Sequence, residues 1–175
     1  ELHAAHGYLL MQFLSAHANK RTDEYGGDFR ARARFILECL EAARSRVGED
    51  FPISLRISGD ECLRGGYGIE DVQTIIPDIV KAGADIINVS FGTHGNAQVS
   101  VGTPNASAPI EYPQGFMAHL ARRIKEITDV PVITVGRYTD PFMMDDVIGR
   151  GDADLVAVAR QHLADPDFLK NALEG

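Results

Sequence analysis

Short β-rich stretches alternate with amphipathic helical stretches along the chain, and this alternation constrains the fold more than any other feature. Two echoes indicate an internal repeat. Residues 81–85 (Lys-Ala-Gly-Ala-Asp) resemble residues 150–154 (Arg-Gly-Asp-Ala-Asp), and Phe51-Pro52 resembles Val130-Pro131. Strands that alternate with helices over about 20 to 50 residues pair in parallel through right-handed crossovers. The pattern therefore predicts an α/β fold, either an open doubly wound sheet or a (βα)8 barrel.

The predicted elements follow from hydrophobic periodicity and from the Gly and Pro residues that bound them. Pro77 falls inside a predicted helix and is expected to kink it or to begin its second half. The loop at residues 91–114 is long, and loops of that length tend to carry function. The predicted helices are 28–47, 69–82, 115–128, 140–148 and one from about 165, and the predicted full strands are 51–58, 85–90, 130–135 and 153–159.

Charge and composition limit the partners and the compartment. The 175 residues are 45% hydrophobic and 24% charged, which suits one domain with a core. A net charge of −8 disfavours nucleic acid and anionic membranes as partners, because both require a surface rich in Lys and Arg. No apolar run approaches the roughly 20 residues that cross a bilayer. Cys39 and Cys62 are too few for a disulfide framework or a metal quartet, so we expect a reducing, cytoplasmic location.

The first ten residues bring two imidazoles and a phenol within six positions at an apolar strand end: His3, His6 and Tyr8. Alternate side chains of a strand share one face, and a bend at Gly7 could turn the next side chain toward them. The three groups could therefore converge on one small polar group and supply hydrogen bonds and a proton. The same residues could equally be two satisfied histidines at a strand end, or half of a metal site.

The continuation of this segment carries more information. After His3-Ala-Ala-His6-Gly7-Tyr8-Leu-Leu come Gln12-Phe13, then the run Asn19-Lys-Arg-Thr-Asp-Glu-Tyr-Gly-Gly27, then an arginine-rich helix start at Arg30. This combination resembles the old yellow enzyme family of flavin oxidoreductases, whose members carry the same groups at matching spacing. The resemblance spans essentially the whole chain, firmly at both ends and loosely between residues 92 and 113.

The resemblance selects the (βα)8 barrel over the doubly wound sheet. A complete barrel needs about 250 residues, whereas this chain shows one strand end and four full strands. We therefore expect residues 1–175 to be one partial FMN-binding barrel domain, the C-terminal half of a TIM barrel with about five parallel strands. The N-terminal strands would be absent from this chain.

The resemblance also implies a flavin site. Arg56, a cation inside an otherwise apolar strand, corresponds to the family arginine beside the pyrimidine edge of FMN, where positive charge stabilises the anionic reduced ring. Its alternative role is an ion pair with a barrel carboxylate. Gly136-Arg137 and Ala159-Arg160 end the last two strands and suit a phosphate, because amides and an arginine fork supply donors there. The family often has Gly-Arg at the second position, where this chain has Ala159.

By the same resemblance, His3 and His6 hydrogen-bond the carbonyl oxygen of an α,β-unsaturated substrate, and Tyr8 protonates the α-carbon after hydride reaches the β-carbon. NADH or NADPH would reduce the flavin. His94 aligns with a loop histidine that assists the acid tyrosine in dienoyl-CoA reductases, and it could equally face solvent. The closing segment looks most like the branch that contains dienoyl-CoA reductases, 2-enoate reductases and trimethylamine dehydrogenase, in which a 4Fe-4S cluster site begins soon after the equivalent of Gly175.

Two alternatives come from other classes. The first is a non-catalytic half-barrel that binds no flavin and self-associates to cover its sheet edges and an inner face, which we expect to carry apolar side chains. The second is a phosphate-binding barrel isomerase or aldolase, although such an enzyme would usually place a lysine or carboxylate at a strand end. The residues expected on or beside the inner face are Leu55, Ile57, Ile87, Val89, Ile133 and Val135.

Overall fold

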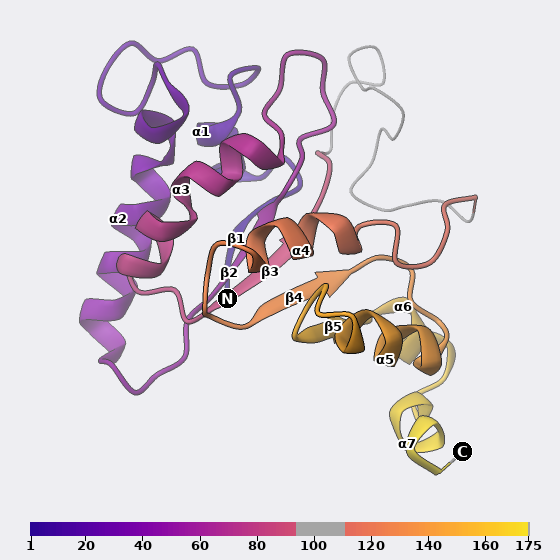
Figure 1. Ribbon diagram of the computed structural model, residues 1–175. Helices are drawn as coiled ribbons and strands as arrows, with labels where there is room; N and C mark the ends of the chain where they lie inside the picture. The colour runs from indigo at the N-terminus through magenta and orange to yellow at the C-terminus, as the bar shows by residue number, and fades with distance from the viewer. Residues whose placement is uncertain (94–110, 175) are drawn as a thin grey trace.

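The computed structural model describes residues 1–93 and 111–174. Its strands form a single five-stranded parallel sheet in the order β1-β2-β3-β4-β5 (Figure 1). The strands are β1 (Leu2–Ala4), β2 (Ser54–Ser58), β3 (Ile86–Ser90), β4 (Val132–Val135) and β5 (Leu155–Ala157). The helices are α1 (Leu9–Leu14), α2 (Phe29–Val47), α3 (Ile69–Lys81), α4 (Ala118–Lys125), α5 (Pro141–Gly149), α6 (Arg160–Ala164) and α7 (Phe168–Glu174).

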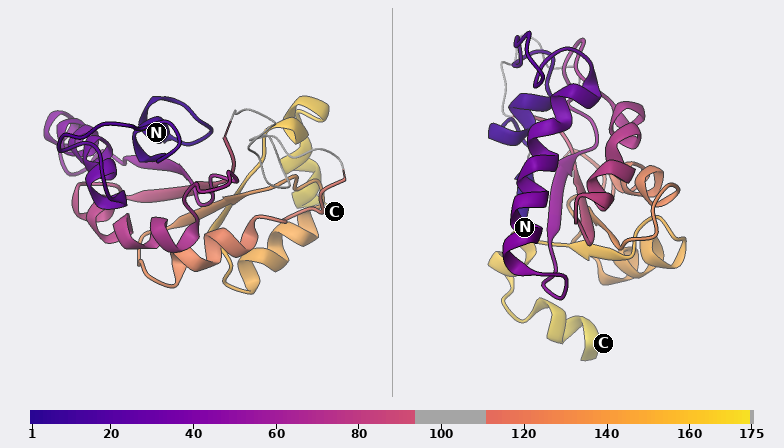
Figure 2. Two further views of the ribbon diagram at one scale, coloured as in Figure 1. Left: turned by 90° about the horizontal axis from the view of Figure 1, so that it is seen from above. Right: turned by 90° about the vertical axis from the view of Figure 1, so that its left-hand side faces the viewer.

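The order of the strands decides between the two predicted architectures. A doubly wound sheet reverses its strand order and carries helices on both faces. Here each strand pairs with the next one along the chain, and the crossover helices α3, α4 and α5 lie along one side of the sheet (Figure 2). This is the winding of a (βα)8 barrel, and the predicted fold class is confirmed.

The face of the sheet that packs against the helices forms the core. Leu55 and Ile57 of β2, Ile87 of β3 and Val132 of β4 have no exposed surface, and Val89 is 1% exposed. The helices contribute their apolar stripes to the same cluster, including Ile36, Leu40, Ile75, Ile76, Ile79 and Ile124. Hydrophobic burial of this kind is the main favourable term in folding.

The opposite face, which is the inner face of a barrel, differs from the prediction. Register places His3, Arg56, Asn88, Ile133 and Leu155 in one row across the five strands, so these side chains share a face. Six residues were expected on or beside this face. Ile133 and Val135 do lie on it. The other four, Leu55, Ile57, Ile87 and Val89, instead pack against the helices, and their neighbours in the strands take the inner face. Both faces of a buried parallel strand can be apolar, and only the register shows which set meets the helices.

The sequence echo has a structural cause at the strand starts. The carboxylate of Asp85, just before β3, accepts a hydrogen bond from the backbone N–H of Ile53 (2.6 Å) and pairs with Arg44 of α2. The carboxylate of Asp154, just before β5, accepts one from the N–H of Val132 (2.9 Å) and pairs with Lys125 of α4. Each aspartate thus joins a strand start to the preceding strand and to a helix end.

Several boundaries differ from the prediction. Helix α4 is shorter than predicted, because residues 111–117 form turns before it. Helix α3 continues through Pro77, from Ile69 to Lys81. Helix α1 was not among the predicted helices. It forms because Met11 and Leu14 are fully buried on one of its faces. None of the described helices is both long enough and apolar enough to cross a membrane.

Candidate active site

The carboxyl ends of the strands meet at one edge of the sheet, as in every parallel sheet, and the predicted site residues gather at this edge or on the inner face below it. His6 and Tyr8 follow β1, Gly136 and Arg137 follow β4, and Ala159 and Arg160 follow β5. In barrel enzymes this edge carries the active site. His94, also predicted as a site residue, lies outside the described residues.

His6 is held in place by two serines at the ends of neighbouring strands. Its backbone N–H donates to Ser58 Oγ (3.2 Å), and its ring nitrogen Nε2 lies 2.7 Å from Ser90 Oγ. The Ser58 hydroxyl in turn donates to the carbonyl of Gly92 (2.9 Å). His6 is 9% exposed and its φ is 61°, an uncommon conformation for a residue with a side chain. These contacts over-determine the backbone turn that aims the His6 ring.

His3 and Tyr8 complete an aromatic cluster with His6. The His3 ring centroid lies 5.1 Å from that of His6 and 5.4 Å from that of Tyr8. Tyr8 precedes α1 and is 54% exposed, so its phenol lies at the rim of the cluster while His6 lies below it. The three side chains therefore lie close together after β1. Within residues 1–93 and 111–174, no three His, Cys, Asp or Glu side chains group as a metal site.

Arg56 projects from the inner face beside His3, its register partner. Its Nε atom is buried and has no hydrogen-bond partner, and Arg56 forms no ion pair with any described residue. The structural alternative, a barrel ion pair, is therefore not seen. A largely buried guanidinium group without an ion-pair partner is costly in a folded protein and suits a polar ligand group on this face.

A cavity of about 310 Å³ opens between the loops that follow β4 and β5. Arg137 and Arg160 line it, together with Ala159. Gly136 precedes it at φ 159° and Arg137 adopts φ 57°, so the chain turns sharply where the arginine enters the cavity. Two guanidinium groups and a cavity of this size fit a phosphate group. The described residues thus fit FMN at two places, Arg56 on the inner face and this cavity.

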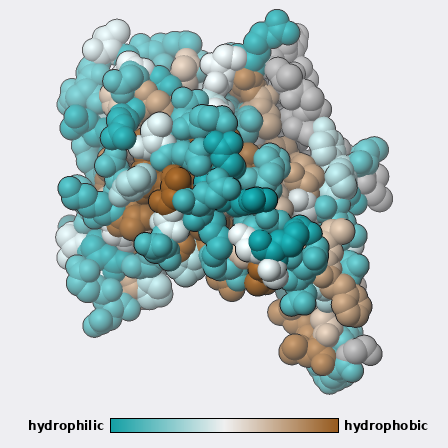
Figure 3. Space-filling model, in the orientation of Figure 1, coloured by the Kyte–Doolittle hydropathy of each residue, from teal (hydrophilic) through white to brown (hydrophobic). Residues whose placement is uncertain are grey.

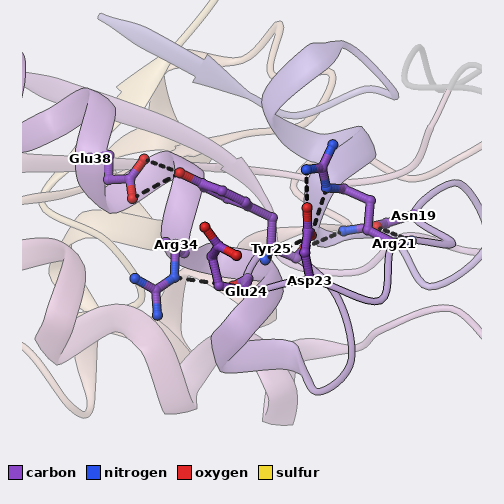
Figure 4. A network of polar contacts seen from close by, with 7 residues as sticks. All are labelled: Asn19, Arg21, Asp23, Glu24, Tyr25, Arg34 and Glu38. Atoms are coloured by element: carbon purple, nitrogen blue, oxygen red, sulfur yellow. Dashed lines mark hydrogen bonds and ion pairs between the residues drawn. The ribbon is translucent and has the colours of Figure 1, made fainter.

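The motif at residues 19–27 has a structural role in this arrangement. Arg21 pairs with Asp23 and stacks over the ring of Tyr25 at 5.4 Å. The Tyr25 hydroxyl donates to the carboxylate of Glu38 on α2 (3.1 Å), and Asn19 binds the carbonyl of Tyr25 (2.7 Å) (Figure 4). The Glu38 carboxylate raises the pKa of the Tyr25 phenol. This network fastens the loop after α1 to α2.

Sequence reasoning did not assign Ser58, Ser90 or Asn88 to the site. The two serines are register partners at the last positions of β2 and β3, and Asn88 is the register partner of Arg56. A polar residue that ends a buried strand was the available signal. It was not sufficient, because only the register brings the two serines to His6.

The sheet is parallel and sequentially ordered, with a histidine-tyrosine cluster, an inner-face arginine and an arginine-lined cavity at or just below its carboxyl edge. This arrangement places the chain among (βα)8-barrel proteins, whose sites lie at that edge. The family model described as "NADH:flavin oxidoreductase / NADH oxidase family" matches residues 1–175. The chain belongs to this family.

Known proteins similar to the chain agree with this assignment. It is 42% identical to the NADH oxidase of Thermoanaerobacter brockii over 175 residues, which is all of this chain and 26% of that protein. It is 35% identical to the cinnamate reductase of Clostridium sporogenes, covering 99% of this chain and 28% of that protein. A solved complex of 2-naphthoyl-CoA reductase matches with a TM-score of 0.87 at 31% identity, covering 99% of this chain and 26% of that one. The chain thus spans about a quarter of these relatives.

Proposed function

We propose that this chain is part of an FMN-dependent oxidoreductase that reduces the C=C bond of α,β-unsaturated carbonyl, enoyl or dienoyl substrates with hydride derived from NADH or NADPH. The observation that carries the proposal is the His3, His6 and Tyr8 cluster beside Arg56 at the carboxyl edge of the sheet. The names of the cinnamate and naphthoyl-CoA reductases support a conjugated substrate. Residues 1–175 would form part of the FMN-binding barrel domain of a cytoplasmic enzyme.

One set of residues in this chain would bind the cofactor. Arg56 would hold the pyrimidine edge of FMN, and Gly136, Arg137, Ala159 and Arg160 would hold its phosphate. When bound, FMN supplies the hydride that reduces the β-carbon of the substrate.

The histidines would bind the carbonyl oxygen and stabilise the negative charge that develops there. Tyr8, exposed at the rim, would deliver its phenolic proton to the α-carbon. His94 would assist Tyr8 from the loop beyond β3.

The test separates the two half-reactions in the flavin-loaded protein by stopped-flow absorbance. Tyr8→Phe is expected to leave flavin reduction by NAD(P)H intact and to slow reoxidation by an enone about 10²–10⁴-fold, the usual contribution of a general acid. Tyr25→Phe, which alters a phenol of the surface network, is the matched control and should change neither rate. Equal slowing of both halves in Tyr8→Phe would contradict the proposal.

The non-catalytic, self-associating alternative is favoured by one observation. Apolar surface gathers around α7 (Figure 3). Exposed apolar side chains include Phe142 of α5, Leu163 of α6 and Leu173 of α7, which are 85%, 85% and 89% exposed. Strands β1 and β5 are also open edges of the described sheet. Light scattering at several concentrations, combined with an absorbance scan after FMN addition, distinguishes the two functions. A colourless protein that associates supports the alternative, and one that takes up FMN supports the oxidoreductase.

A further inference from the structure

Two buried polar atoms on the inner face lack hydrogen-bond partners: Arg56 Nε and Asn88 Oδ1. The two residues are register partners on the adjacent strands β2 and β3, so their side chains leave the same face of the sheet next to each other. Arg56 Nε carries only a donor and Asn88 Oδ1 is only an acceptor. The two atoms do not bond each other in this structure, yet each is what the other needs, so a small rotation of the Arg56 side chain would join them.

The orientation of the Asn88 amide is not arbitrary. Its Nδ2 donates to Glu1 Oε2 at 3.0 Å, and Ser54 Oγ donates to the same oxygen at 3.0 Å. An ionised carboxylate can only accept, so Asn88 must present its NH₂ group to Glu1. The carbonyl oxygen of the amide is thereby directed away from Glu1. Asn88 is 7% exposed, which leaves Oδ1 little access to water as an alternative donor.

We propose that Asn88 is a positioning residue for Arg56: its Oδ1 accepts the Nε–H of Arg56, with Glu1 fixing the amide in the orientation that this requires. The proposal rests on the FMN-binding role of Arg56. With Nε held, the two terminal nitrogens of the guanidinium group stay available as a fork for the pyrimidine edge of the cofactor. A fork fixed in advance loses less conformational freedom when the ligand binds.

The chemical nature of the acceptor matters as much as its place. Asn88 is neutral, so it can hold Arg56 without cancelling the positive charge. A carboxylate at the same position would form an ion pair and offset the charge that stabilises an anionic reduced flavin. The choice of asparagine thus positions Arg56 and keeps its charge directed at the cofactor.

The first experiment reads the hydrogen bond in this chain without any flavin. Solvent exchange of the Arg56 Nε–H is followed by NMR, with the signal assigned by its loss in Arg56→Lys. Asn88→Ala is expected to speed exchange at least about tenfold, because an unbonded side-chain N–H is less protected. Asn171→Ala removes an amide from the exposed surface of α7 and should leave the rate unchanged. Unchanged exchange in a folded Asn88→Ala chain would overturn the proposal.

A crystal structure of the wild-type chain keeps the proposal testable even if Asn88→Ala does not fold. We expect Arg56 Nε to bind Asn88 Oδ1 directly or through one water molecule. Donation from Arg56 Nε to any other protein group would overturn the assignment.

The second experiment measures the midpoint potential of the flavin-loaded protein. Asn88→Asp is expected to make two-electron reduction about tenfold less favourable, equivalent to about 30 mV. Asn171→Asp makes the same chemical change on α7 and should leave the potential unchanged. An unchanged potential in Asn88→Asp would contradict the inference that a neutral residue at position 88 preserves the effect of the Arg56 charge on the flavin. A wild-type protein that takes up no FMN would instead refute the proposed function, while the exchange experiment would still decide the hydrogen bond.

Discussion

The two faces of the sheet are built from the same strands but use them in opposite ways. On the outer face, Leu55, Ile57 and Ile87 are fully buried against the helices in an apolar cluster. On the inner face, the row that begins with His3, Arg56 and Asn88 carries donors and acceptors, two of which lack partners. The outer face stabilises the fold. On the inner face, buried polar groups without partners lower the stability, and the same groups are available for binding.

The inner face is itself divided. Its β1–β3 half carries His3, Ser54, Arg56 and Asn88, whereas its β4–β5 half carries Ile133 and Leu155, of which Leu155 is 47% exposed. Polar recognition is therefore concentrated on the side of the sheet that also holds the histidine-tyrosine cluster. The apolar half suits the uncharged surface of a ring system rather than its polar edge.

Adjacent isoleucines of β3 give the sharpest test of the comparison. Ile87 faces the helices with no exposed surface, and Ile86 faces inward and is half-buried. Ile87→Ala should lower the free energy of unfolding by about 2–5 kcal/mol, through lost burial and a cavity. Ile86→Ala should cost about 1 kcal/mol or less, because little burial is lost. Urea denaturation of both variants checks this, and equal costs would show that the two faces do not differ.

Removing an inner-face donor should harm binding more than folding. His3→Ala or His6→Ala in the flavin-loaded protein should weaken a phenolic ligand about 10- to 100-fold, the loss expected for a hydrogen bond to a charged group. FMN affinity should change much less, because these donors face the ligand. Spectral titration with a phenol measures the first quantity and fluorescence titration the second. Unchanged phenol affinity in both variants would remove the carbonyl-binding assignment.

The strand-start aspartates provide a smaller effect with a defined pH dependence. The backbone N–H of Ile53 lowers the pKa of Asp85, and Lys125 lowers that of Asp154. A depressed folded-state pKa contributes stability above the unfolded value, and that contribution is lost as pH falls through the folded value. Asp85→Asn and Asp154→Asn should therefore destabilise the chain at pH 7, by about 1 kcal/mol or less because both pairs are partly exposed.

Thermal melting at two pH values checks this prediction. The difference between wild type and each variant should shrink when the pH falls well below 4, where the wild-type aspartates are protonated as well. A difference that stays constant with pH would mean that packing, and not charge, accounts for the loss.

The smallest effect should have the opposite sign. Glu61, in the loop between β2 and α3, is 2% exposed, and its carboxylate accepts from the backbone N–H of Tyr67 (3.4 Å). Burial raises its pKa. A raised folded-state pKa gives stability that is present at low pH and lost as pH rises through the folded value.

Glu61→Gln keeps the shape and the acceptor oxygen but cannot ionise. It should therefore melt at a slightly higher temperature than wild type at pH 7 and at the same temperature below pH 4. Glu41→Gln, an exposed position on α2, serves as the control. A lower melting temperature for Glu61→Gln at pH 7 would show that the ionised carboxylate stabilises the fold.

The sequence determined the element types, their order and the family. The β-rich runs around Leu55, Ile87 and Val132 and the repeated Ala-Asp pair before two of the strands are local properties, so they can be read without a structure. The clustering of His3, His6 and Tyr8 was also predictable, because His3 lies in a short strand and the other two follow it directly in the sequence. The placement of Arg137 and Arg160 at strand ends followed from the same local pattern.

Tertiary structure decided everything that depends on register. Both faces of β2 and β3 are largely compatible with burial, and a shift of one residue in pairing would exchange them, so the sequence could not tell which isoleucines meet the helices. The serines that hold His6 and the pairing of Arg56 with Asn88 join positions 30 to 90 residues apart, beyond any local pattern. Long-range contacts are fixed by the packing of the whole sheet. In this chain they orient the side chains of a motif, His3, His6 and Tyr8, that could be recognised in the sequence alone.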